Sequence, residues 1–420
     1  MHSAVSTLAR PAAHAARLQP SIGIAAGFFI CQSCLSLSRR RAAPSSYRKS
    51  LFSTQTQALP DAPASSGLAA LPSRRLISVS GPDAAKYLQG VITANITDPS
   101  SGGPRTSGFY AAFLTAKGRV LHDVFIYPDH AEGGKPPTGD SFLIEVDAAE
   151  AQRLQQHIKR YKLRANFDVR LLDTEERQVW HAWSDGASDL CSSMTSTNAD
   201  EFIFQPDPRA PGLGYRLITS CSTSSSSPIQ QISDNLPVLS EEYYRIRRYL
   251  HGVPEGQQEI LRDQALPLES NIDFMGDGID FRKGCYVGQE LTIRTKHRGV
   301  VRKRILPVML YNNSSEKPTE MVYRPSISSE LLPAPESRIG RHEKTGRVGH
   351  WLRGIGSIGL ALCRLEAMTD IQPASTFPGA KWVLAEDEFI IAGQQEEQQF
   401  KIKAFVPDWL RSELLKPPAH

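Results

Sequence analysis

One cysteine of this chain stands in a setting that favours reactivity. Cys285 lies in residues 281–290, which read FRKGCYVGQE. A glycine on each side of it, at positions 284 and 288, permits a tight turn that would present the thiol to solvent. The basic Arg282 and Lys283 would favour the thiolate, the form that attacks electrophiles and ligates metals. A free cysteine is often a small core residue instead, so these residues alone leave both interpretations open.

The other cysteines suggest no metal site built by this chain alone. Cys31 and Cys34 have the spacing of a redox or zinc pair, but they lie in a segment that we expect to be removed. The rest are widely and irregularly spaced, at Cys191, Cys221 and Cys363. Such spacing indicates neither a CxxC pair nor a disulfide framework. A cluster held at Cys285 would therefore need ligands from a partner.

The first sixty residues have the composition of an organelle transit peptide. They contain seven basic residues and no acidic one. We expect 1–60 to be a mitochondrial presequence and linker, cleaved between residues 48 and 60, and the mature protein to work in the mitochondrial matrix. The apolar run at 22–37 is interrupted and shorter than the ~20 residues of a membrane span, so no stable membrane insertion is expected.

Without this segment the chain is mildly acidic. Of its 48 basic residues 41 remain, against 44 acidic ones, a net charge of −3. This charge gives the folded part no overall attraction to nucleic acid. The most basic run, at 294–304, also lacks the interleaved aromatic residues that stack on bases. We expect this run to form a strand and turn that line an anionic-ligand pocket or a docking surface for an acidic partner.

Alternating apolar patterns and capping signals predict the elements that position these residues. Residues 61–71 are expected to be a linker, and the Asp-x-Arg turn at 207–209 to be structural. Strands are predicted at 74–79, 109–114, 119–127, 167–172 and 178–183. Three helices are predicted: one at 83–89, one that follows a capping box at 147–150, and one at 240–252. Short strands dominate afterwards, at 305–310, 347–350, 358–365, 382–385, 389–392 and 400–405, which is typical of a small antiparallel barrel.

The stretch KGCYVGQE at 283–290 resembles the signature of the YgfZ-type proteins. These are folate-binding relatives of the glycine-cleavage aminomethyltransferase (GcvT, or T-protein) that assist iron–sulfur cluster assembly. Similar blocks occur along the chain from about residue 68 to 410. The resemblance implies an α+β fold, a GcvT/YgfZ-like three-lobed ring. Two interleaved α+β lobes would form a folate-binding region over 68–300, and an antiparallel β-barrel would follow over 301–412.

The resemblance also implies a folate site. Residues 267–274, PLESNIDF, match the block whose Pro-x-Glu carboxylate holds the pterin ring, which places that role on Glu269. A carboxylate suits a pterin edge because it accepts hydrogen bonds from adjacent N–H donors. Asn271, Lys283 and Arg298 are the further candidates for cofactor contacts.

One acidic residue departs from the transferase pattern. The T-protein branch carries two adjacent acids after its hairpin turn, one of them catalytic, whereas this chain has His122 followed by Asp123. Asp123 is the candidate catalytic acid, with an ordinary polar strand residue as the equal alternative. Because a positioned acid is central to aminomethyl transfer, this departure weighs against that chemistry.

Three functions follow from these residues. The first is a mitochondrial iron–sulfur assembly factor without catalytic turnover, acting late with A-type carriers in the maturation of [4Fe-4S] enzymes such as aconitase and lipoyl synthase. Cys285 would then be its reactive or ligating thiol, sharing a [2Fe-2S] or [4Fe-4S] cluster transiently with the partner, and tetrahydrofolate its implied cofactor. The second is a folate-dependent one-carbon transferase that needs Asp123, and the third a scaffold with a vestigial pocket. The Cys285 motif favours the first, because a T-protein-like transferase has no need of it.

Overall fold

The computed structural model describes residues 59–98, 101–129, 140–186, 202–220, 228–298, 300–312, 315–341, 346–371, 388–394 and 398–416. All of them belong to one compact unit, Ala58–His420. Outside the described residues lie the predicted presequence except its residues 59 and 60, the predicted strand at 382–385, and four of the six cysteines.

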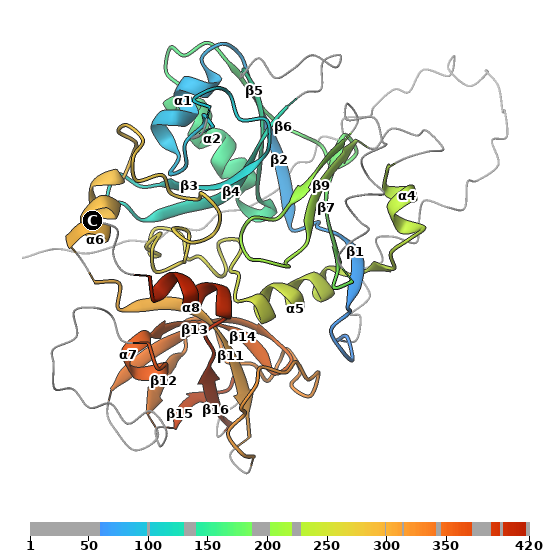
Figure 1. The fold of residues 1–420 in the computed structure, drawn as a ribbon, viewed down its shortest axis with the longest axis vertical. Coiled ribbons are helices and arrows are strands. Elements are labelled where there is room, and N and C mark those ends of the chain that lie inside the picture. The colour runs from blue at the N-terminus through green and yellow to red at the C-terminus, as the bar shows by residue number, and fades with distance from the viewer. Residues whose placement is uncertain are drawn as a thin grey trace, which may run out of the picture. The chain divides into compact units, whose positions relative to one another are not determined.

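Two five-stranded sheets are built by a chain that leaves the first and later returns to it (Figure 1). The first sheet has the order β10-β1-β7-β9-β8, with β1 Ser66–Ala70, β7 Arg177–Ser184, β8 Phe202–Pro206, β9 Tyr215–Ser220 and β10 Val238–Leu239. The second has the order β3-β4-β5-β2-β6, with β2 Arg74–Ser80, β3 Phe109–Leu114, β4 Val120–Pro128, β5 Ser141–Asp147 and β6 Asp168–Leu171. This path confirms the prediction of two interleaved α+β lobes.

Two helices cover one face of the second sheet. They are α1, Ala84–Val91, and α2, Ala151–Tyr161, which follows the short 3-10 turn η2, Ala148–Glu150. Leu88 of α1 and Leu154 and Ile158 of α2 pack with strand residues in one buried cluster. The predicted capping box is only half formed. Asp147 accepts a hydrogen bond from the amide of Ala149, whereas Glu150 ends the 3-10 turn and pairs with Arg153 of α2.

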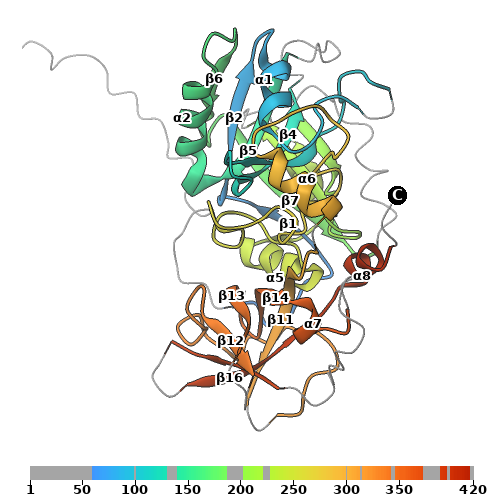
Figure 2. The ribbon, with the colours of Figure 1, turned by 90° about the vertical axis from the view of Figure 1, so that its left-hand side faces the viewer.

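The opposite face of the second sheet packs toward the first sheet and helix α5. Tyr110 and Phe125 of the second sheet share a buried cluster with Trp183 and Ile218 of the first and with Tyr244 of α5. Helix α5, Glu241–His251, follows the predicted pattern and ends at Gly252, whose φ of 70° is left-handed. It contacts β1 on one side and barrel strands β11 and β14 on the other (Figures 1 and 2).

The C-terminal part is a closed antiparallel barrel, as predicted. Its strands run in the order β11-β14-β13-β12-β15-β16. They are β11 Lys303–Tyr311, β12 Arg338–Arg341, β13 Arg347–Ile355, β14 Ile358–Arg364, β15 Phe389–Ala392 and β16 Gln399–Ala404, and the helices α7 Leu365–Met368 and α8 Asp408–Leu414 accompany them. Closure leaves no unpaired strand edge. Among the helices of the described residues, α4 (Pro228–Ser233) included, none has the length and apolar character that a bilayer crossing requires.

Two predictions of local structure were wrong. The expected linker at 61–71 contains β1, a central strand whose Leu68 and Ala69 are fully buried. Its sequence, SGLAA, carries little β-propensity, since it contains no β-branched or aromatic residue. Its small residues instead make room for a large side chain of the neighbouring strand. A Cβ at Gly67 would lie 2.6 Å from the Trp183 ring. The basic run expected to be a strand and turn from residue 294 instead continues helix α6, Gln289–Arg298, and the strand begins only at Lys303.

Candidate functional site

Cys285 is exposed on a loop that is anchored from within. The side chain of Lys283, two residues earlier, turns inward and is 7% exposed. Its Nζ donates hydrogen bonds to the carbonyl oxygens of Ile92 and Ala94, at 2.9 and 2.8 Å. On the other side of the cysteine, the amide of Val287 donates to the carbonyl of Gly90. The loop therefore presents its thiol on a fixed backbone.

The Lys283 side chain anchors the loop, because its ammonium donates to the carbonyl oxygens of Ile92 and Ala94. An effect of this charge on the Cys285 thiol stays a prediction. Burial lowers the pKa of Lys283 to about 8, against a weaker opposing effect of Asp280. A contact with a bound cofactor would require the ammonium to leave these carbonyls, and such a contact stays a prediction.

The two glycines around Cys285 differ in function. Gly288 has a φ of 82°, and a Cβ there would overlap the carbonyl oxygen of Thr115 in the β3–β4 turn. Close packing on that turn thus requires glycine. At Gly284 a Cβ would meet no other atom within 4 Å, and the residue has no positive φ, so its backbone does not require glycine.

An open hollow of about 800 Å³ lies beside the cysteine loop. Its lining residues come from the β3–β4 turn, the loop and one side of α6: Ala116, Tyr286, Gly288, Gln289, Glu290, Ile293, Arg294 and His297. Val287, next to the cysteine, is 41% exposed. The thiol therefore sits in a surface with room for a second protein.

The described residues contain no group of three or more His, Cys, Asp or Glu side chains that could hold a metal ion. Cys285 would consequently supply a single ligand to any cluster. The other cysteine that the structure describes, Cys363, is fully buried in the barrel, and burial raises the pKa of its thiol well above the ordinary value. Cys285 is thus the accessible thiol of the described chain.

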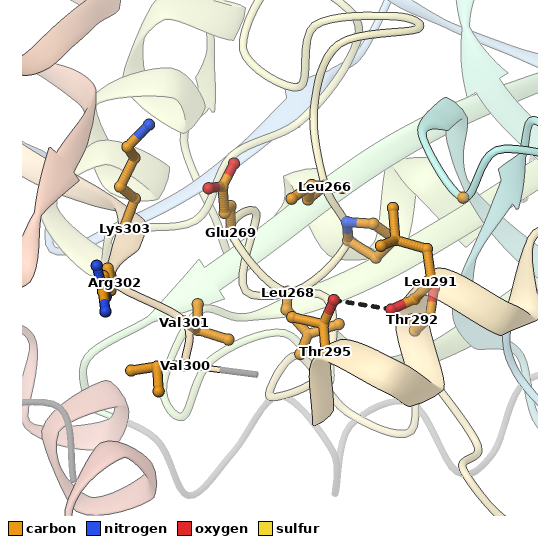
Figure 3. Close-up of a pocket in the computed structure, with 12 residues that line it drawn as sticks. Leu266, Leu268, Glu269, Leu291, Thr292, Thr295, Val300, Val301, Arg302 and Lys303 are labelled. Carbon is orange, nitrogen blue, oxygen red and sulfur yellow. Dashed lines mark hydrogen bonds between the residues drawn. The ribbon is translucent and has the colours of Figure 1, made fainter. Parts of the chain in front are cut away.

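Glu269 lies between two cavities. One, of about 250 Å³, is lined by residues 266–269, by Leu291, Thr292 and Thr295 of α6, and by residues 300–303. The other, of about 210 Å³, includes Glu269, Arg119 and His350. Figure 3 shows the Glu269 carboxylate and the Lys303 ammonium extending in the same direction. Burial raises the pKa of Glu269, while Lys303, Arg119 and Arg304 oppose the shift.

The carboxylate of Glu269 can accept hydrogen bonds from a pterin-like group. No described residue donates a hydrogen bond to its carboxylate, which leaves both oxygens available to N–H donors of a ligand. Each cavity alone is smaller than a typical ligand pocket of roughly 300–1,000 Å³, but Glu269 lines both. The other candidates differ. Asn271 is fully buried and donates to the carbonyl of Ile305, and the side chain of Arg298 lies outside the described structure.

Asp123 is fully buried between the two sheets. Its Oδ1 accepts hydrogen bonds from the Gly256 amide and the Gln257 side chain, both at 3.1 Å. Burial raises its pKa, although Arg74, 3.8 Å away, opposes the shift. Asp123 lines neither cavity at Glu269. Its position is that of a structural carboxyl group rather than of an acid that faces a substrate.

The raised pKa of Asp123 gives a pH-dependent prediction. The folded state holds the proton of this carboxyl group more tightly than the unfolded state, so Asp123 destabilises the fold as pH rises above its ordinary pKa of about 4. We expect Asp123→Asn, which cannot ionise, to gain free energy of unfolding relative to wild type between pH 4.5 and pH 8. Urea unfolding at both pH values measures this gain, with the exposed Asp168→Asn as control. A relative loss at pH 8 would mean that the carboxylate is charged and stabilises Arg74.

The residues that sequence reasoning missed form a buried ionic network between the sheets. Arg209 pairs with Asp207 and Glu255, and Arg216 pairs with Glu255 and Glu145. Both arginines are fully buried. Of this network, only the Asp-x-Arg turn could be recognised in the sequence. The structural role predicted for this turn agrees with the ion pair between Asp207 and Arg209. The acids and bases come from segments far apart in the chain, so no local pattern reveals them.

Comparisons with known proteins agree with this geometry. Residues 302–412 match the family described as "CAF17, C-terminal beta-barrel domain". Proteins of Chaetomium globosum, Pyricularia oryzae and Neurospora crassa, each named "Iron-sulfur cluster assembly factor IBA57 homolog, mitochondrial", are 49%, 53% and 47% identical to this chain. The alignments cover 96%, 83% and 91% of this chain and 97%, 86% and 88% of theirs.

The fold has a solved relative. The crystal structure of glycine cleavage system aminomethyltransferase T from Bartonella henselae is similar to this chain, with a TM-score of 0.57 and 11% sequence identity. The similarity covers 83% of this chain and 87% of that chain. It confirms the predicted GcvT-like fold.

Proposed function

Because the chain belongs to the family of mitochondrial iron–sulfur cluster assembly factors named IBA57 homologues, we propose that it acts in the mitochondrial matrix as a late factor that handles clusters together with an A-type carrier. It would serve the maturation of [4Fe-4S] enzymes of the aconitase and lipoyl synthase type. In this function the cluster is cargo, which the chain helps to build or deliver.

The observation that carries the proposal is the setting of Cys285. Its thiol is exposed on a loop that Lys283 and Val287 fix to the end of α1. Among the described residues no second group stands with it to complete a metal site. A single rigid thiol suits a cluster bridged between two proteins, because the partner supplies the remaining ligands and can withdraw with the cluster.

The chemistry asked of Cys285 is ligand exchange. Its Sγ would lose a proton to solvent and bind one iron of the cluster, one of the carrier's ligands would leave that iron, and the carrier's other ligands would hold the rest. The neighbouring hollow and the exposed Val287 give the partner a surface to pack against. No redox change of the cysteine is required for this step.

Activation of an apo-enzyme tests this function. Apo-aconitase is incubated anaerobically with a cluster-loaded A-type carrier, with and without the purified chain. We expect the chain to raise the rate or yield of aconitase activation, and Cys285→Ser to behave as if no chain were added. Equal activation with and without the wild-type chain would contradict the proposal.

The cavity at Glu269 supports tetrahydrofolate as a ligand of this factor. Glu269 would accept hydrogen bonds from the pterin edge, and Lys303 and Arg119 stand near enough to raise the affinity for an anionic tail. When bound, folate would supply a one-carbon carrier. What this chain's residues do in the proposal is bind and orient it.

Glu269→Gln is expected to weaken tetrahydrofolate binding by roughly ten- to a hundredfold, since a hydrogen bond to a charged group contributes about 1.5–3 kcal/mol. Anaerobic fluorescence titration of the purified chain measures the change. Glu330→Gln, an exposed glutamate of the barrel, is the matched control. Unchanged binding in Glu269→Gln would show that the ligand binds at another site. If the wild-type chain does not bind tetrahydrofolate, the pocket is vestigial.

The transferase alternative has less support. It needs a catalytic acid at Asp123, and this carboxyl group is buried with hydrogen bonds from Gly256 and Gln257. Turnover that needs tetrahydrofolate, that is lost in a folded Asp123→Asn variant and that persists in Cys285→Ser would support the transferase function instead.

A further inference from the structure

A polar cavity of about 280 Å³ adjoins the smaller cavity at Glu269, with which it shares the lining residue Glu259. It shares no lining residue with the larger cavity at Glu269 or with the hollow at the cysteine loop. It is enclosed by three parts of the chain. Arg74 and Asp147 come from the second sheet, Arg245 and Arg248 from α5, and Arg353 from barrel strand β13. Figure 2 shows α5 lying between the sheet strands and β13.

The acidic groups of this cavity are already engaged within the protein. Glu255 accepts from Arg209, Arg216 and Tyr244. Glu259 accepts two hydrogen bonds from Arg248 and one from Tyr249.

The two remaining acids are engaged as well. Asp147 accepts from the amides of Ala149 and Gln257. Glu241 accepts from Ser73, and burial raises its pKa, which favours the neutral form. Little acceptor capacity for a cation is left.

The arginines keep donors that no protein acceptor uses. Arg74 is 4% exposed, and its Nε donates to Glu145, but its Nη1 and Nη2 have no hydrogen-bond partner. The Nε of the equally buried Arg248 also has no hydrogen-bond partner, although the Oε1 of Glu255 lies 3.7 Å from it. A buried donor without a hydrogen bond is unfavourable, more so when it carries charge, so these groups favour an acceptor in the cavity.

Two further arginines stand at the cavity's rim. Arg245 and Arg353 are partly exposed, and neither makes a hydrogen bond or ion pair with another described residue. Positive charge with free N–H groups thus converges from three directions on one space.

We propose that this cavity binds a small multivalent oxyanion, a di- or tricarboxylate or a phosphate ester. Charge-assisted hydrogen bonds from Arg74 and Arg248 hold one end of it, and Arg245 and Arg353 hold the other. Because Arg353 belongs to the barrel and Arg74 to the second sheet, the bound anion ties these two parts to α5. Binding therefore stabilises the folded chain.

The test uses the full chain with citrate and inorganic phosphate as probes, read by thermal unfolding and by isothermal titration calorimetry. Sodium chloride at equal ionic strength is the control for non-specific salt effects, which do not saturate. The informative variant is Arg245→Gln with Arg353→Gln, because both side chains are partly exposed and outside the buried pairs. Arg164→Gln is the control for a change of net charge, because Arg164 is exposed and lies shortly after the C-terminal end of α2.

We expect citrate or phosphate to raise the unfolding midpoint of wild type saturably. Loss of one charged hydrogen bond weakens binding roughly tenfold or more, so the double variant should bind at least tenfold more weakly. A preference for citrate identifies a carboxylate ligand, and a preference for phosphate a phosphate ester. No saturable response to either probe, or a double variant that responds like wild type, would overturn the proposal.

Two further variants locate the anion. Glu269→Gln and Cys285→Ser should both respond to the anion as wild type does. A response lost in Glu269→Gln would place the anion in the folate cavity and overturn the assignment. The readout involves no cluster, so its failure is distinguishable from failure of the assembly function.

Discussion

Replacing Arg216 with alanine is expected to lower the free energy of unfolding by about 3–5 kcal/mol, because it leaves buried carboxylates without their cation. Arg216 is fully buried and pairs with Glu145 and Glu255, and it also donates to the hydroxyl of Tyr244. Glu145 belongs to the second sheet, Arg216 to the first and Tyr244 to α5. The substitution therefore weakens the contact between all three.

Urea unfolding followed by circular dichroism measures this change. The control is Arg170→Ala, which breaks an exposed ion pair with Glu176 and should change stability by no more than about 1 kcal/mol. Arg216→Lys separates charge from geometry. It keeps the cation but not the fork that reaches two carboxylates, so we expect an intermediate loss. Equal stability of Arg216→Ala and Arg170→Ala would show that the network contributes little.

Sequence patterns were most reliable where local chemistry decides the structure. The helix from Glu241 begins behind Ser240, carries acids in its first turn and ends at a left-handed Gly252, all of which are local signals. The barrel strands likewise alternate and are separated by turns. The local residues around Cys285 left an exposed and a buried thiol equally open, and the structure shows it exposed.

Long-range packing accounts for what the sequence could not show. Strand β1 was missed because Gly67 and Ala69 look like a linker until Trp183 packs over them. Lys283 looked like a neighbour of the thiol, but its ammonium is drawn to carbonyls of residues 92 and 94, almost two hundred positions earlier in the chain.

The ionic network shows the same limit. Arg74 and Glu255 are brought into one cluster only by the docking of the two sheets. Each looks like an ordinary surface charge in its own stretch of sequence. Tertiary structure brings such buried charges together. Only the pair that is close in sequence, Asp207 and Arg209, could be recognised as a turn from the sequence alone.

The second large effect is expected at Cys285. Substitution by serine removes the single thiolate that the described chain can offer to a cluster, since Cys363 is buried in the barrel core. The loop geometry should survive, because the anchors are the Lys283 side chain and the backbone of Val287. Serine also has nearly the size of cysteine. We therefore expect complete loss of cluster sharing with little change in stability.

Formation of the cluster-bridged complex tests this account most directly. The chain and an A-type carrier are reconstituted anaerobically with iron and sulfide, then separated by size exclusion while the visible absorption of the cluster is recorded. Wild type and Cys363→Ala should elute with the carrier as a coloured complex, and Cys285→Ser should leave the carrier to elute alone. A coloured complex that forms equally well with Cys285→Ser would contradict the proposal that this thiol holds the cluster.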